Sequence, residues 1–185
     1  RDRRLFLQIV SGCVRLRARL DARLKRLTGL RRWDDAVAVA LRVALYQLEE
    51  MDRIPAHAAI GESVEWVRRK RGRRLANWTN AQLRLLQREG IPGDDPDPEK
   101  EPLRFAADTL SYPEWLATRW IEELGPQQAF TVMAAMNSHD GTWFRWNARR
   151  EGFPALLGEL TEADVAFQRA PLLPNAFRIP GAWPD

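Results

Sequence analysis

Few side chains in this sequence could act as nucleophiles or metal ligands. Cys13 is the only thiol, and His57 and His139 are the only histidines. Cys13 stands among apolar residues at helical spacing, which predicts a small core residue rather than the basic, partly exposed setting of a reactive cysteine. Two histidines and one cysteine cannot build a conventional zinc site without several carboxylates. The sequence therefore predicts neither a catalytic residue nor a metal site in this chain.

Ser138, His139 and Asp140 have the side chains of a hydrolase triad, but they are consecutive. Triads are assembled from distant positions, so a polar turn ending in Asp-Gly is the better interpretation. His57 has the spacing of Ile60 and Val64, which predicts a structural histidine in the first turn of a helix. Neither a Walker loop nor a G-x-G-x-x-G motif occurs. Binding, rather than catalysis, is the expected function.

Basic residues are concentrated in the first half of the chain. Residues 1–90 contain 21 Lys and Arg against 10 Asp and Glu, whereas residues 91–185 contain 8 against 15. Such a surplus favours a polyanionic partner, although most charge runs are only solvated surfaces. The candidate residues for contact with such a partner, nucleic acid or an anionic surface, form three groups: Arg15, Arg19 and Arg23 (followed by Arg26) at helical spacing; Arg68, Arg69, Lys70, Arg71, Arg73 and Arg74; and Arg145 and Arg149, beside Arg150, around an aromatic strand.

Helices are expected to position the basic residues of the first half. Apolar residues from Phe6 to Leu27 recur every three or four positions, which predicts one helix over residues 3–27. Asp34 or Asp35 is expected to cap a second helix, and Pro55 to open a third. A fourth helix is expected after Gly72, reaching about residue 88, with Leu75, Thr79, Leu83 and Leu86 buried. The prediction for residues 1–90 is a compact helical bundle.

The second half has a different composition. Residues 91–103 contain four prolines and a block of acids, which predicts a linker. Ser111 and Glu114 have capping-box spacing before a helix over 114–124, and Pro126 starts another that reaches about residue 136. Strands are expected at 143–147, 165–169 and 176–179, with a short helix at 153–160. Residues 104–185 are thus predicted to form a small α+β domain, and the whole fold to be mainly α.

Composition limits the class of protein further. No apolar run approaches the roughly 18 residues of a membrane helix, so no membrane partner is expected. A single cysteine rules out an intramolecular disulfide and indicates a reducing, cytoplasmic location. Eight tryptophans are many for this length. Trp115, Trp120 and Trp146 fit core positions, while any exposed tryptophan would suit base stacking.

Three ordered segments resemble one known family. The segment Ile54–Glu65 (IPAHAAIGESVE) looks like the helix start of NusB-like RNA-binding domains. The segments at 40–48 (ALRVALYQL) and 75–84 (LANWTNAQLR) look like two flanking helices of the same fold. Gly61 departs from the family, which usually has Asn there, as do Trp78 and Thr79, where it usually has Phe-Val. The resemblance implies a NusB-like helical bundle, with the family's first helices absent from this chain.

The second half resembles a narrower group. Tyr112-Pro113-Glu114-Trp115-Leu116, followed by Arg119-Trp120 and Leu124-Gly125, is similar to the segment after the NusB-like domain in bacterial small-subunit ribosomal RNA cytosine-5 methyltransferases. The resemblance implies a substrate-recognition portion that binds ribosomal RNA and is not catalytic by itself. S-adenosylmethionine and the attacking cysteine would belong to a domain missing from this chain, so no cofactor is expected here.

Two alternatives to RNA recognition stay open. NusB-like bundles in the antitermination relatives pair with a ribosomal protein, so the chain is alternatively a module that docks a partner protein. The departures at Gly61 and at residues 138–141, where the family commonly has Arg-Pro-Pro before the strand, are also consistent with a remnant without function. The salt dependence of binding separates the first two, because phosphate contacts release counterions and an apolar interface does not.

Overall fold

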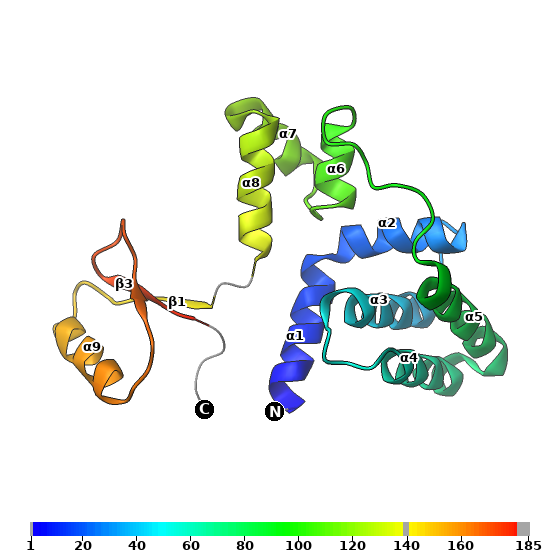
Figure 1. The fold of residues 1–185 in the computed structure, drawn as a ribbon, viewed down its shortest axis with the longest axis horizontal. Helices are drawn as coiled ribbons and strands as arrows, with labels where there is room; N and C mark the ends of the chain where they lie inside the picture. Colours follow the sequence, from blue (N-terminus) through cyan, green and yellow to red (C-terminus); the bar gives the residue numbers. More distant parts are fainter. Residues whose placement is uncertain (1, 139–140, 181–185) are drawn as a thin grey trace. The chain divides into compact units, whose positions relative to one another are not determined.

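The computed structural model describes residues 2–138 and 141–180. Contacts divide this part of the chain into two compact units, residues up to Asn137 and residues from Ser138 onward. The first unit is helical, and the second holds a small sheet with one helix (Figure 1). The predicted fold class, mainly α with a small α+β C-terminal part, is therefore confirmed. Within the described residues, no helix is long and apolar enough to cross a membrane.

The first predicted helix is two helices that meet at an angle. Helix α1 spans Asp2–Arg15 and α2 spans Arg17–Thr28, with Leu16 between them at φ −94° and ψ 19° (Figure 1). The backbone N–H groups of Ala18 and Arg19 donate to the Ser111 hydroxyl oxygen, at 3.0 and 3.4 Å. A distant serine thus satisfies donors that a continuous helix would bond internally. The expectation of one helix over residues 3–27 is wrong for that reason.

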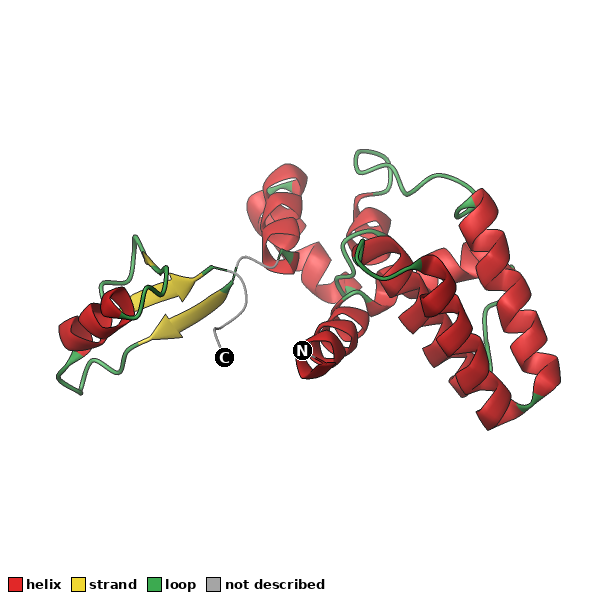
Figure 2. Cartoon of the chain, turned by 60° about the horizontal axis from the view of Figure 1, so that its bottom comes forward, coloured by secondary structure: helices red, strands yellow, loops and turns green. Residues whose placement is uncertain are grey.

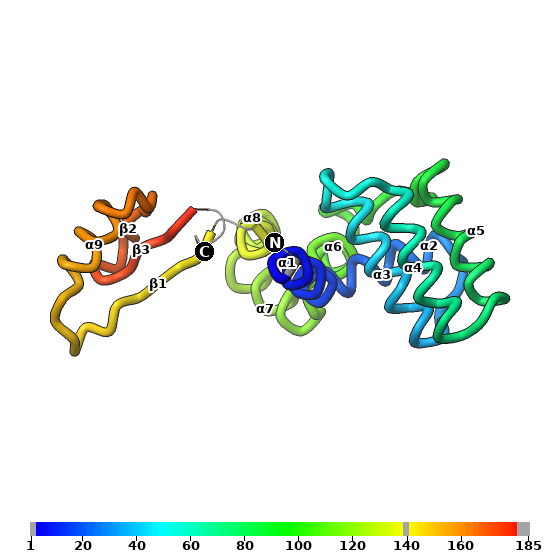
Figure 3. Tube along the Cα trace, turned by 90° about the horizontal axis from the view of Figure 1, so that it is seen from below, coloured from blue at the N-terminus to red at the C-terminus, as the bar shows by residue number. Residues whose placement is uncertain are grey.

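Helices α3 (Asp35–Glu50), α4 (Ala56–Arg71) and α5 (Arg73–Glu89) lie side by side (Figure 3). Asp34 caps α3 as predicted, because its carboxylate accepts hydrogen bonds from the N–H groups of Ala36 and Val37. The core that these helices share with α2 is built from aliphatic side chains that are almost wholly buried: Leu20, Leu24, Leu41, Leu45, Ile60, Val67 and Leu83.

Three shorter helices complete the first unit: α6 (Pro102–Asp108), α7 (Glu114–Leu124) and α8 (Pro126–Asn137). They enclose a separate small core of Ala106, Ala117, Ala129 and Met133. Helix α6 also packs on α2, so these three helices belong to the helical unit. The division at residue 138 is one of contacts between compact units, and the domain boundary expected at residues 91–103 stays a prediction.

The second unit contains β1 (Thr142–Arg145), α9 (Phe153–Glu162), β2 (Gln168–Arg169) and β3 (Ala176–Ile179). The sheet is antiparallel in the order β1-β3-β2, with Trp143 opposite Arg178 and Phe144 opposite Phe177. Apolar side chains of α9 pack with Phe177 and Ile179, so the helix covers one face of the sheet (Figure 2).

Some positions predicted to be buried are not. Phe6, on the expected apolar stripe, is 63% exposed, and Trp115 is 69% exposed. Trp115 lies two residues before Ala117, which faces the small core, and this spacing places it on the other side of α7. Leu48, Met51 and Leu75 are half-buried at the margin of the main core. Phe6 and Trp115 thus lie on exposed faces of their helices, and the other three lie at the edge of the main core.

Candidate nucleic-acid interface

The densest group of cations lies where α4 ends and α5 begins, and we call residues 68–74 the basic junction. Gly72 separates the two helices with φ 83°, a left-handed value that favours glycine. All six cationic side chains of the basic junction are exposed: Arg68, Arg69, Lys70, Arg71, Arg73 and Arg74. The fold therefore gathers this predicted group of RNA-binding residues at one corner between two helices.

The two helix ends at the basic junction have opposite electrostatic preferences. The C-terminus of α4 attracts cations, and its last turn holds Arg68 to Arg71. The N-terminus of α5 carries a partial positive charge, yet α5 begins with Arg73 and Arg74 and has no acid in its first turn. These two arginines do not stabilise the isolated helix. Both the helix dipole and the guanidinium groups favour an anion bound from outside.

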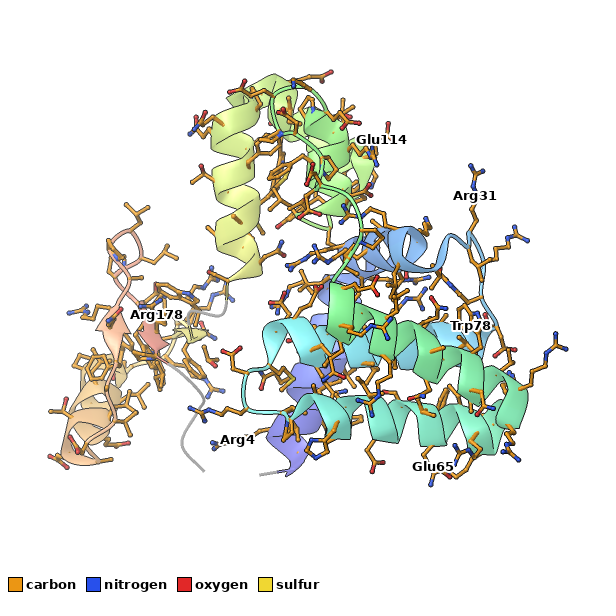
Figure 4. All side chains as sticks on the ribbon, turned by 45° about the vertical axis from the view of Figure 1, so that its right-hand side comes forward. Arg4, Arg31, Glu65, Trp78, Glu114 and Arg178 are labelled. Atoms are coloured by element: carbon orange, nitrogen blue, oxygen red, sulfur yellow. The ribbon has the colours of Figure 1, made fainter. Side chains whose placement is uncertain are left out.

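Carboxylates reach only part of the basic junction. Arg68 pairs with Glu65 (labelled in Figure 4) at 3.0 Å, and the Arg71 Nε donates to both Asp34 oxygens at 2.9 Å. That hydrogen bond, with two from backbone N–H groups, holds the pKa of Asp34 below its ordinary value. In the described part of the chain, no carboxylate lies within ion-pair distance of the remaining four cations, Arg69, Lys70, Arg73 and Arg74.

The second predicted group has acidic neighbours. We call Arg19, Arg23 and Arg26 the α2 arginines. Arg19 pairs with Glu50 at 2.9 Å, and Arg23 pairs with Glu49 at 2.9 Å. Arg26 pairs with Asp95 at 2.6 Å, and Arg23 reaches the same carboxylate at 3.4 Å. These side chains, and that of Arg15, are half-buried. The α2 arginines join α2 to α3 and to the segment expected as a linker, and their contact with RNA stays a prediction.

Burial and the neighbouring cations have opposite effects on the pKa values of the acids that pair with the α2 arginines. Burial raises the pKa of Glu49 even though Arg23 and Arg19 favour its ionised form. Burial also acts on Asp95, but hydrogen bonding to Arg26 and the charges of Arg23 and Arg26 bring its pKa below the ordinary value. The α2 arginines therefore oppose the effect of burial on the pKa of both carboxylates.

Cys13 is half-buried and packs against the main core, as its apolar surroundings predicted. Its thiol donates to the Arg42 carbonyl at 3.8 Å. Burial raises the pKa of the thiol to about 11, although the Arg42 charge lowers it. Because the thiolate is the nucleophilic form, Cys13 is almost fully protonated at neutral pH.

His57 lies in the first turn of α4 as predicted, but its side chain is exposed and does not share the buried face of Ile60 and Val64. Across residues 2–138 and 141–180, no group of three or more His, Cys, Asp or Glu side chains could hold a metal ion. Of the triad-like residues, His139 and Asp140 lie outside the described residues.

Among the tryptophans predicted to be core residues, two are half-buried. Trp120 packs beside Tyr112 with ring centroids 5.6 Å apart, and the Trp146 indole N–H donates to the Arg150 carbonyl at 2.8 Å. Trp115 is exposed instead, and so is Trp143 on β1, at 56%. These two have open ring surface of the kind that stacks on bases.

The third group of predicted RNA-binding residues lies in the second unit. Arg145 is exposed on β1, and Arg149 is exposed in the turn that follows. On the same face of the sheet as Arg145, the Arg178 guanidinium lies 5.8 Å from the Trp143 ring centroid. The second unit therefore places cations and one exposed indole on a sheet face opposite the α9 core.

A groove of about 550 Å³ beside the basic junction escaped sequence reasoning. We call it the indole groove. Its lining includes the apolar side chains of Leu30, Trp33, Val37, Leu75 and Trp78 and the charged side chains of Arg32, Asp34, Arg71 and Arg74. Arg74 and Trp78 are four residues apart on α5, so they share a helix face. The spacing of Arg74 and Trp78 in the sequence indicates that they share a face. Trp33 comes from another segment, so only folding brings the two indoles together.

Both halves of the chain match described protein families. Residues 1–88 match the NusB family, and residues 112–184 match the ferredoxin-like domain of RsmF/B-like methyltransferases. The matched ranges contain the three NusB-like segments and the Tyr112–Gly125 segment on which the resemblance was based.

Curated relatives align with nearly the whole chain. A probable ribosomal RNA small subunit methyltransferase B of Bacillus subtilis is 28% identical over 182 residues, which is 96% of this chain and 40% of the relative. Ribosomal RNA small subunit methyltransferases B of Vibrio cholerae and Pseudomonas putida are each 34% identical, over 85% and 89% of this chain and 36% and 37% of the relatives. The chain thus spans about two fifths of the length of these proteins. It consists of a NusB-family domain followed by a ferredoxin-like domain of the RsmF/B methyltransferase type.

Proposed function

We propose that this chain binds ribosomal RNA through phosphate contacts at the basic junction and serves as the recognition part of a small-subunit ribosomal RNA methyltransferase. One observation carries the proposal: four exposed cations beside the N-terminus of α5 have no carboxylate within ion-pair distance among the described residues. Phosphates bind such a surface by releasing counterions. The names of the aligned relatives supply the class of RNA.

The only thiol of this chain does not fit the role of the nucleophile that attacks cytosine. The sequence has no G-x-G-x-x-G loop, and its only thiol is half-buried with a raised pKa. No methyl-transfer step is therefore assigned to these residues. In this proposal the methyl donor and the attacking cysteine belong to a further domain, and the present chain holds the RNA.

Salt-dependent binding of a small-subunit ribosomal RNA fragment tests the proposal. Wild-type chain is titrated by fluorescence anisotropy between about 50 and 200 mM salt, a range over which phosphate binding weakens steeply. A variant with Arg69, Lys70, Arg73 and Arg74 all replaced by Gln should bind roughly 100-fold more weakly at low salt. Its slope of log affinity against log salt should be shallower by about 3, since each single-strand phosphate contact contributes about 0.7.

A double variant provides the matched control. Arg84→Gln with Arg88→Gln removes two exposed arginines from the same helix, while Arg73→Gln with Arg74→Gln removes two from the basic junction. Only the junction pair should reduce affinity and slope. Equal losses in both pairs would mean that RNA responds to net charge alone, and would reject the basic junction as the contact surface.

A protein partner is the second candidate, because α1 has an exposed apolar face. Four of its side chains lie at helical spacing and are at least two fifths exposed: Phe6, Leu7, Val10 and Val14. Scattered exposed apolar residues are common, whereas a row on one helix is typical of an interaction site. If the chain binds RNA weakly and with a shallow salt slope, this face becomes the better candidate, and Phe6→Ser with Val14→Ser should then abolish the binding of the partner.

A further inference from the structure

The indole groove lies next to the basic junction and shares Arg71 and Arg74 with it. Its apolar lining is half-buried or buried at Trp33, Val37 and Trp78, while Arg32 and Arg74 are exposed. Aromatic surface is thus bordered by guanidinium groups. A volume of about 550 Å³ is within the range of small-molecule sites, roughly 300–1,000 Å³.

We propose that the indole groove receives one unpaired nucleotide of the bound RNA, with its base stacked on an indole ring and its phosphate held by Arg32 or Arg74. The inference rests on the proposed RNA binding and specifies which form of RNA is bound. A strand whose phosphates contact Arg73 and Arg74 lies beside the groove, so that an adjacent base can turn into it.

The rings are held by the fold before any ligand arrives. Both Trp33 and Trp78 pack against the main core, and the Trp33 indole N–H donates to the Thr28 hydroxyl at 3.2 Å. Because that donor is already used, Trp33 offers a ligand its ring surface rather than its N–H. Stacking on a fixed ring costs little ordering of the protein, and it tolerates every base, since each base has a π face.

The charges of the groove favour a nucleotide over an apolar peptide. Three arginines line it against a single aspartate. The Asp34 carboxylate accepts hydrogen bonds from Arg71 and from the N–H groups of Ala36 and Val37, so its charge is largely offset. A phosphate therefore meets a net positive rim, whereas a buried apolar side chain would leave the arginines without partners.

Paired bases cannot occupy this groove, because their faces are covered by their neighbours in the helical stack. The inference therefore predicts a difference between two probes with the same sequence. One is a short single-stranded oligoribonucleotide from small-subunit ribosomal RNA, and the other is that strand annealed to its complement. Both carry phosphates for the basic junction, but only the first has free bases.

The experiment measures the affinities of both probes for wild-type chain and for Trp78→Leu. Removing one stacking ring should weaken single-strand binding about tenfold and leave duplex binding within twofold, and Trp78→Phe should restore single-strand affinity. Thermal unfolding and the unchanged duplex affinity report that the variant is folded. Arg32→Gln lies on an exposed loop position and gives a second test, with Arg31→Gln as its matched control. Arg31 points away from the fold on the same loop (Figure 4).

Each outcome decides the inference. A loss confined to the single strand in Trp78→Leu and Arg32→Gln, but absent from Arg31→Gln, supports it. Equal losses of affinity for both probes, or no loss of affinity in either variant, would overturn the binding of an unpaired base in the indole groove. RNA binding at the basic junction would still stand. If wild-type chain binds neither probe, the proposed function fails and the groove inference fails with it.

Discussion

The basic junction and the α2 arginines both consist of cations on helices of the first unit, but they differ in their acidic neighbours. Three acids, Glu49, Glu50 and Asp95, surround the α2 arginines at 2.6 to 3.7 Å. Among the described residues, only Glu65 and Asp34 lie within ion-pair distance of the basic junction, and each pairs with one arginine. The two regions therefore have the same residue types and different electrostatic environments.

A row of arginines in a sequence therefore does not by itself identify a binding surface. The acids that pair with the α2 arginines come from α3 and from the 91–103 segment, far away in sequence. The Arg19, Arg23 and Glu49 side chains are only 18 to 27% exposed, whereas the Asp95 side chain is 46% exposed. Such pairs hold elements together, while exposed cations without acids remain available for an external anion.

The largest effect on folding should come from breaking the paired region. Arg23→Met removes the cation nearest to Glu49, whose pKa burial already raises and whose Oε2 makes no hydrogen bond. We expect the free energy of unfolding to fall by about 2 kcal/mol, between the values for exposed and fully buried pairs. Arg69→Met at the basic junction should change it by less than about 0.5 kcal/mol. Urea denaturation monitored by circular dichroism measures both.

The RNA affinities of the same two variants also test whether the α2 arginines and the basic junction differ. Folded Arg23→Met should keep the affinity of wild type for the ribosomal RNA fragment, and Arg69→Met should lose several-fold. The opposite result is that Arg23→Met leaves the stability unchanged and lowers the affinity for RNA. It would support the prediction, made from their spacing, that the α2 arginines contact RNA.

The sequence predicts helices well where the determinant is local. The Asp34 cap and the break at Gly72 follow from residues within a turn of the feature they explain. The bend at Leu16 does not, because Ser111, which caps α2, is remote in sequence. The indole groove was missed for the same reason, since Trp33 and Trp78 meet only after folding. The spacing of charged residues predicts both arginine groups, but it does not show which group pairs with acids.

An intermediate effect is expected at Ser111, which attaches the α6–α7 loop to α2. The expected capping box of α7 is absent: α7 has no side-chain cap, and the Ser111 hydroxyl instead accepts from the N–H groups of Ala18 and Arg19. Ser111→Ala should lower the free energy of unfolding by about 1 kcal/mol, as other lost caps do. Ser111→Gly should cost less, because φ is 63° at this position and glycine adopts that value without strain. Equal stability of Ser111→Ala and wild type would show that the bend at Leu16 does not need this hydroxyl.

The smallest effect concerns Asp95, which joins the 91–103 segment to α2. Its pKa lies below the ordinary 3.8 because Arg26 and Arg23 outweigh burial, so the folded state favours the ionised carboxylate. This stability is fully present above pH 3.8 and is lost as the pH falls through the lowered pKa. Asp95→Asn should therefore be less stable than wild type by under about 1 kcal/mol near neutral pH, and the gap should close in acid.

Asp94→Asn is the matched control for this change, since the Asp94 carboxylate has no cation within ion-pair distance in the described part of the chain. It should follow the wild-type stability at every pH. Because Asp95 is partly exposed, added salt should shrink the Asp95→Asn gap as acid does. The absence of a gap near neutral pH and at low salt would mean that the segment is held by packing, as the buried Pro96 would allow, and that the charges on α2 are not what fixes it. The α2 arginines would then resemble the basic junction more closely than their ion pairs indicate.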